Sequence, residues 1–88
     1  MQVREFIEEY LSSCDDNIVY LHAPDNCGGE MFSIHEWRES ENRPILSEIV
    51  YDYLECEVSQ IRAKVENYRY NLAVVIHIYT ELPYEEAK

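Results

Sequence analysis

The fold of this chain is decided where its apolar residues change period, from PILSEIVYDYLE at residues 44–55 to QIRAKV at residues 60–65. In the first stretch apolar residues recur in pairs every four positions, which predicts a helix of about three turns. In the second stretch apolar and basic residues alternate, which predicts a strand. Residues 70–79 also alternate but are apolar on both faces, so we expect this last strand to be central or well covered. Residues 66–69 are predicted to form the turn between the two strands.

Working outward from this stretch, the first half of the chain predicts one more helix and a hairpin. Residues 3–13 form an amphipathic helical pattern, and residues 18–22 are rich in β-branched and aromatic side chains, which predicts a strand. A turn cluster follows at residues 24–29. Residues 30–35 would complete the hairpin, although residues 34–39 could instead form a short helical turn. The apolar face of the first helix is predicted to contain Val3, Phe6, Ile7, Tyr10 and Leu11.

These elements in the order α-β-β-α-β-β predict an α+β fold of two layers, an antiparallel four-stranded sheet with helices on one face. The length of 88 residues fits one domain. We place the domain at residues 1–80 and a loosely ordered acidic tail at residues 81–88. The chain begins without an apolar signal core and has no membrane-length apolar run, so we expect a cytoplasmic protein.

The charge is large and unevenly distributed. The net charge is −11, and residues 1–57 alone contain 14 acidic and 3 basic residues, whereas residues 58–80 have a net charge of +2. A strongly acidic protein is repelled by nucleic acids and anionic membranes, so neither is expected as a direct partner. Such a charge attracts a basic protein surface, or it serves solubility alone.

The candidate partner-binding residues are acidic side chains on the two predicted helices. Glu48, Asp52 and Glu55 stand three or four positions apart and share one helix face, with Tyr51 beside them. Glu5, Glu8 and Glu9 lie away from the apolar stripe of the first helix. Tyrosine is abundant, and a ring with a hydroxyl suits an interface. Besides Tyr51, three tyrosines are predicted outside or at the rim: Tyr68, Tyr70 and Tyr84.

No catalytic, cofactor-binding or metal-binding residues are predicted. The three cysteines, Cys14, Cys27 and Cys56, are widely spaced, and no paired zinc-ligand spacing occurs. Cys27 with His22 or His35 as a base would be the nearest approach to a nucleophile. Its acidic surroundings would raise the pKa of the thiol rather than lower it. His77 lies inside the apolar strand and is predicted to be a hydrogen-bonded, half-buried histidine.

The segments 3–11 and 18–20, VREFIEEYL and IVY, resemble the start of small proteins carried by phages and mobile elements of bacteria. The layout of residues 56–63 and 72–76 is similar to their C-terminal hairpin. Size, acidity and tyrosine content also resemble anti-CRISPR and other DNA-mimic inhibitors. The resemblance implies an inhibitor that occupies the basic nucleic-acid-binding surface of a bacterial defence nuclease. The alternatives are a homodimeric accessory protein, structural or regulatory, that pairs through its second hairpin or a helix face, and a small enzyme.

Overall fold

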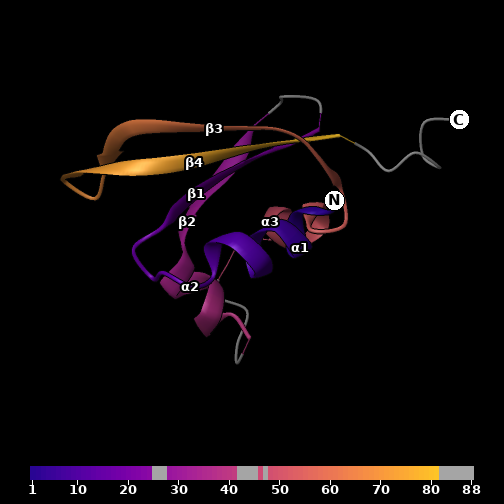
Figure 1. Cartoon of the computed structure of the whole chain (residues 1–88), viewed down its shortest axis with the longest axis horizontal. Helices are drawn as coiled ribbons and strands as arrows, with labels where there is room; N and C mark the ends of the chain where they lie inside the picture. The colour runs from indigo at the N-terminus through magenta and orange to yellow at the C-terminus, as the bar shows by residue number, and fades with distance from the viewer. Residues whose placement is uncertain (25–27, 42–45, 47, 82–88) are drawn as a thin grey trace, which may run out of the picture.

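The computed structural model describes residues 1–24, 28–41, 46 and 48–81, and Figure 1 shows their arrangement. Several predictions concern residues outside the described ones: Cys27 with the turn around it, the start of the helix predicted from Pro44, and Tyr84 with residues 82–88 of the tail. The helices and strands are α1 (Val3–Phe6), η1 (Ile7–Leu11), β1 (Ile18–His22), β2 (Gly29–Ser33), α2 (Ile34–Glu39), α3 (Glu48–Tyr53), β3 (Glu57–Tyr68) and β4 (Asn71–Glu81).

The predicted first helix is present, but its second half is a π-helical turn. The Ser12 amide donates to the Ile7 carbonyl at 2.9 Å, a bond that spans five residues rather than four. In this geometry Val3, Ile7 and Leu11, spaced four apart, are buried. The prediction that Tyr10 shares this face is wrong, because its side chain is 59% exposed. The wider turn rotates Tyr10 away from the core, and its ring lies beside that of Phe6, with centroids 5.3 Å apart.

The sheet is mixed, so the prediction of a fully antiparallel sheet is wrong. The strand order is β2-β1-β4-β3, and β1 pairs antiparallel with β2 but parallel with β4. Parallel neighbours require a long crossover connection, and the chain between β2 and β3 supplies it through α2 and α3. The hairpin β3–β4 then enters with β4 beside β1. The prediction that the last strand is central is confirmed.

Local chemistry settles the alternatives left open after the first hairpin and corrects the predicted turn of the second. Residues 29–39 form both a strand and a helix, because the Ser33 hydroxyl accepts from the Glu36 amide and the Glu36 carboxylate accepts from the Ser33 amide. The turn predicted at residues 66–69 is wrong. Strand β3 continues to Tyr68, and the turn consists of Arg69 and Tyr70, with φ of 49° and 74°. Two left-handed residues match the twist of a hairpin.

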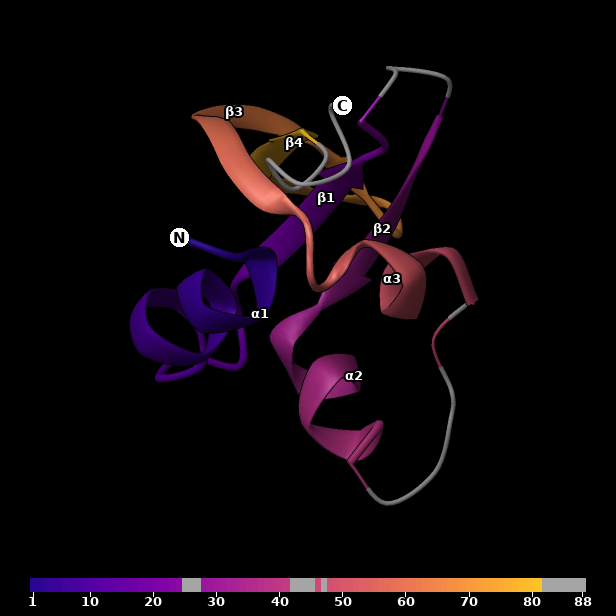
Figure 2. The ribbon, with the colours of Figure 1, turned by 90° about the vertical axis from the view of Figure 1, so that its right-hand side faces the viewer.

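The core lies between the helices and one face of the sheet, and Figures 1 and 2 show α1 and α3 next to that face. Each fully buried aliphatic or aromatic side chain stabilises the fold by about 1.5–3 kcal/mol. In the described part of the chain, no helix is long and apolar enough to cross a membrane. The core side chains are Val3, Ile7, Leu11, Val19, Leu21, Phe32, Ile34, Trp37, Leu46, Val50, Leu54 and Ile78.

Candidate functional site

The acidic residues predicted to bind a partner lie on two segments, α1 with η1 and α3 with the residues that follow it. The Val3 amide donates to the Cys56 carbonyl at 3.0 Å, and the Arg4 amide donates to the Leu54 carbonyl at 3.1 Å. These two bonds hold the start of α1 against the residues just after α3, and Figure 2 shows α1 and α3 below the sheet. The two acidic segments are therefore joined on the same side of the sheet.

All six carboxylates on these segments are exposed. We call them the acidic helical layer: Glu5, Glu8, Glu9, Glu48, Asp52 and Glu55. Among the described residues, their one ion pair joins Arg4 Nε to Glu55 Oε1 at 3.5 Å, between two exposed side chains. Glu5 also accepts from the Gln2 amide at 3.1 Å and so stabilises the start of α1.

Tyr51, predicted at the rim beside these carboxylates, has a different position. Its ring packs against the core, and its hydroxyl has no hydrogen-bond partner among the described residues. A buried hydroxyl without a partner is uncommon, because its desolvation is then uncompensated. The Tyr51 side chain lines a pocket of about 170 Å³, which also borders the acidic helical layer. The pocket is lined by Arg4, Glu8, Trp37, Ser40, Glu41, Tyr51 and Leu54.

A second cluster, which the sequence analysis missed, lies on the opposite face of the sheet. His22 Nε2 is 2.8 Å from His77 Nδ1, and His77 Nε2 is hydrogen-bonded to the Glu66 carboxylate. The three residues come from β1, β4 and β3. His77 is buried as a hydrogen-bonded residue, as predicted, but its partners could not be named without the parallel register of β1 and β4.

Two tyrosines enclose the histidine pair. The Tyr79 ring stacks on His22 with centroids 4.1 Å apart, and the Tyr20 ring stacks on His77 at 5.4 Å. Because ring faces are occupied by neighbouring rings, the cluster is packed internally rather than open as a stacking platform. The Thr80 hydroxyl also donates to the His22 carbonyl at 2.6 Å and fixes the backbone of β1 beside β4.

The two ring nitrogens of His77 have different partners, the Glu66 carboxylate at Nε2 and the His22 ring at Nδ1. Between the two rings one nitrogen donates and the other accepts, and the tautomers of the two histidines set which. Burial lowers the pKa of His22, and the nearby His77 and Lys64 lower it further, against an opposing effect of Glu66. The arrangement therefore keeps His22 neutral near pH 7.

No metal site is formed in the part of the chain that the structure describes. Glu66 and His22 bond to opposite nitrogens of His77, so their ligand atoms do not converge, and no group of three His, Cys, Asp or Glu does so elsewhere among these residues. Cys14 is a free exposed thiol, and Cys56 is a free buried thiol whose pKa is raised by burial. His35, the other base considered for Cys27, is exposed and pairs with Glu39.

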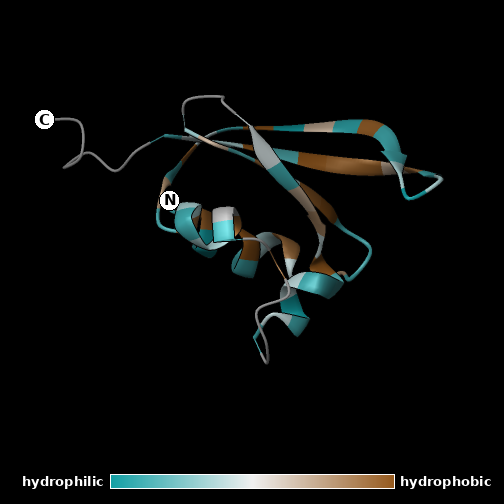
Figure 3. Cartoon of the chain, turned by 180° about the vertical axis from the view of Figure 1, so that it is seen from behind, coloured by the Kyte–Doolittle hydropathy of each residue, from teal (hydrophilic) through white to brown (hydrophobic). Residues whose placement is uncertain are grey.

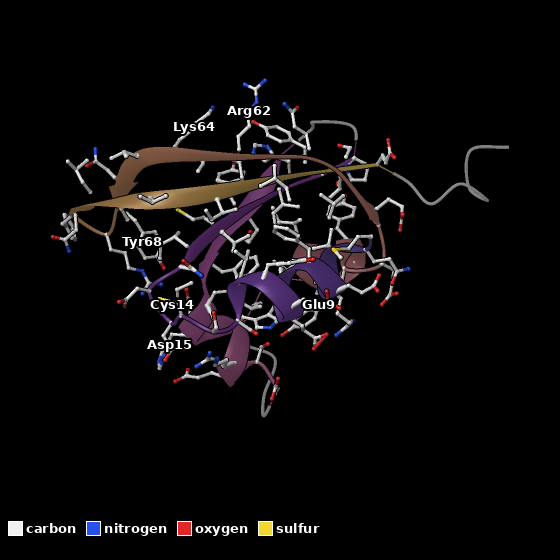
Figure 4. All side chains as sticks on the ribbon, in the orientation of Figure 1. Glu9, Cys14, Asp15, Arg62, Lys64 and Tyr68 are labelled. Carbon is white, nitrogen blue, oxygen red and sulfur yellow. The ribbon has the colours of Figure 1, made fainter. Side chains whose placement is uncertain are left out.

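The tip of the β3–β4 hairpin is fixed to the start of α2 through Glu36. Its carboxylate accepts from the Tyr68 hydroxyl and from Arg69 Nη2, both at 3.1 Å. Burial alone would raise the pKa of Glu36, but the Ser33 and Tyr68 hydrogen bonds and the Arg69 charge bring it below its ordinary value. Figure 4 shows Tyr68 on the side of the hairpin that faces α2, whereas Arg62 and Lys64 point away from the helices.

Comparisons of the chain with protein-family models, with curated proteins and with solved structures find no match.

Proposed function

We propose that this chain is a protein-binding inhibitor whose acidic helical layer occupies the basic nucleic-acid-binding surface of a larger protein, with a nuclease of a bacterial defence system as the partner class. Exposed carboxylates on one element would meet the Lys and Arg side chains that normally hold phosphates. Inhibition then requires only occupancy and no chemistry in this chain.

The observation that supports this proposal is the joining of two acidic segments by hydrogen bonds. Glu48 and Asp52 are one helical turn apart on α3, and Glu55 follows that helix. The residues just after α3 are hydrogen-bonded to the start of α1, which carries Glu5 and continues into η1 with Glu8 and Glu9. Within the described residues only Arg4 neutralises a member of the layer through an ion pair. A concentration of exposed, largely unpaired carboxylates favours encounter with a basic surface.

Displacement of nucleic acid is the test. A panel of purified RNA-guided nucleases is loaded with fluorescent duplex DNA, and the protein is titrated in at low and at physiological salt. We expect displacement from at least one nuclease, weakening steeply as salt rises because the contacts are ionic. The double variant Glu48→Lys with Asp52→Lys should lose displacement by orders of magnitude, since like charges across an interface cost several kcal/mol.

A matched control separates the position of the charges from their number. Glu39→Lys with Glu81→Lys makes the same change in net charge on α2 and at the end of β4, outside the acidic helical layer. This control should keep most of the displacement. Equal loss in both double variants would mean that net charge alone acts, and undiminished displacement by the Glu48 and Asp52 variant would exclude this helix as the binding surface.

A further inference from the structure

The far half of the β3–β4 hairpin carries apolar side chains that are exposed. By register Val65 faces Val74, Asn67 faces Leu72 and Ile61 faces Ile78, so these residues share one face of the hairpin. We call the exposed apolar members of this face the apolar arm: Leu72 at 72%, Val65 at 67%, Val74 at 55% and Ile61 at 39% exposure. Figure 3 shows apolar segments on the hairpin where it extends beyond the helices. Contiguous exposed apolar surface of this kind marks an interaction site.

Strand β3 also presents an open backbone edge. It is the last strand in the order β2-β1-β4-β3. At the start of β3 the outer side is occupied, because Gln2 bridges Glu57 and the Val58 amide donates to the Met1 carbonyl. Farther along, this side of β3 has no strand partner among the described residues. The two-residue turn makes Tyr68 and Asn71 a hydrogen-bonded pair, so the odd-numbered residues from 61 to 67 direct their amide and carbonyl groups to the open edge. Such an edge is a template for another strand.

We propose that this edge pairs antiparallel with β3 of a second copy of the chain, with Val65 on the twofold axis. A twofold interface uses the same patch on both copies, so the patch must be complementary to itself. The apolar arm satisfies this requirement, because it contains no charged side chain and its Val65 meets Val65 of the second copy. The paired edge extends the sheet across both chains and covers part of the apolar arm.

The charged residues of β3 favour this register over the neighbouring centres on Ala63, Lys64 and Glu66. With Val65 on the axis, Lys64 lies opposite Glu66 of the second copy and Glu66 lies opposite its Lys64. Centring on Ala63 would oppose Arg62 and Lys64, centring on Lys64 would oppose two lysines, and centring on Glu66 would oppose two glutamates. Like charges directly opposite destabilise a strand pair, whereas opposite charges stabilise it.

The overall charge distribution favours the same edge. Two chains of net charge −11 repel each other, but residues 58–80 have a net charge of +2, and Figure 4 shows Arg62 and Lys64 of β3 pointing away from the helices. Contact at β3 is therefore less repulsive than contact at the acidic helical layer. The layer contains no residue of β3, so the dimer leaves it free, and this inference does not depend on the proposed function.

A pair of charge variants tests the register. Sedimentation equilibrium of the wild type should show a monomer–dimer equilibrium below roughly 1 mM, the weak end of specific association. Lys64→Glu alone and Glu66→Lys alone should each weaken dimerisation by about tenfold or more. In either variant, residues 64 and 66 carry the same charge and face each other at two places in the dimer. Mixing the two variants should restore association as a heterodimer, since all facing pairs become opposite in charge. The proposal would be overturned if the wild type remained monomeric up to roughly 1 mM protein, or if the Lys64→Glu variant dimerised as strongly as the wild type.

Cross-linking provides a measurement that does not require the Glu66 variant to fold. In a Cys14→Ser, Cys27→Ser background, Val65→Cys places two thiols opposite each other on the axis, whereas Ala63→Cys places its thiol opposite Asn67. Mild oxidation should give a disulfide-linked dimer much faster with Val65→Cys than with Ala63→Cys. Equal rates, or faster cross-linking of the Ala63→Cys protein, would show that this register is wrong.

Discussion

His22 Nε2 lies 2.8 Å from His77 Nδ1 although the two residues are 55 positions apart in the chain. They meet because β1 and β4 run parallel, with Tyr20 beside His77 and Leu21 beside Ile78. Glu66 of β3 completes the chain of hydrogen bonds from the opposite side of β4. One polar cluster therefore joins three of the four strands, and its protonation state is coupled to the stability of the sheet.

Acidification should destabilise the protein through His22. The pKa of His22 in the folded chain lies below the ordinary value of 6.5, so between these two values the unfolded chain binds more protons than the folded one. The stabilising contribution is complete above about pH 6.5 and is lost as the pH falls through the folded pKa. Thermal unfolding monitored by circular dichroism should give a lower Tm at about pH 5.5 than at about pH 7.5.

The origin of this effect is checked with two histidine variants. His22→Gln keeps a donor for His77 but cannot titrate, so its Tm should change much less over the same pH interval. His35→Gln removes an exposed histidine of α2 and should show the same change in Tm with pH as the wild type. If the Tm of His22→Gln changed with pH as much as that of the wild type, the pH dependence of stability would come from another group.

Replacing Glu36 by Ala should destabilise the protein by about 2 kcal/mol, because one carboxylate caps α2 and also binds the hairpin tip. Urea unfolding measures the free energy, and hydrogen exchange at residues 66–71 should accelerate as the tip is released. Glu39→Ala, at an exposed ion pair on the same helix, is the matched control and should change stability by less than about 1 kcal/mol. Similar losses in both variants would contradict the role of Glu36 as the anchor.

Gly29→Ala should cost roughly 1–3 kcal/mol through steric overlap. A Cβ at this position would overlap the ring of Tyr20 and come within 2.5 Å of the Leu21 carbonyl oxygen, and backbone cannot yield as a side chain can. The Tm should fall, and the near-ultraviolet circular dichroism should change as the Tyr20 ring is displaced from its stacking on His77. A variant with wild-type Tm and an unchanged spectrum would mean that β2 lies farther from Tyr20.

Tyr70→Gly should stabilise the protein by roughly 0.5–1 kcal/mol. Tyr70 has a φ of 74° and is fully exposed, so the substitution relieves a left-handed conformation without removing a buried contact. Tyr10→Gly is the opposite control, since Tyr10 is also exposed but lies in a helix, where glycine destabilises. Denaturant midpoints for the two variants should shift in opposite directions, and a destabilised Tyr70→Gly protein would indicate a contact of this ring.

Much of the local structure followed from the sequence alone, because hydrophobic period and capping chemistry act between near neighbours. Enrichment in β-branched and aromatic residues predicted β1, and alternation predicted most of β3. Apolar residues on both faces predicted the central position of β4, and four-residue pairing predicted a helix where α3 lies. The π turn at Ile7–Leu11 and the continuation of β3 to Tyr68 were not predictable in this way. The π turn depends on how the helix packs against the rest of the protein. The length of β3 depends on a turn whose residues, Arg69 and Tyr70, are not typical of left-handed positions.

The sequence by itself determined which residues are acidic and that their excess lies before residue 58, since charge is a property of composition. Only the tertiary structure decided that the two acidic segments are hydrogen-bonded to each other, that Tyr51 packs inward, and that His22, His77 and Glu66 form one hydrogen-bonded chain. Periodicity tells which face of a strand is buried but not which strand becomes its neighbour. That choice depends on how the crossover through α2 and α3 directs the second hairpin to β1, which is a consequence of long-range packing.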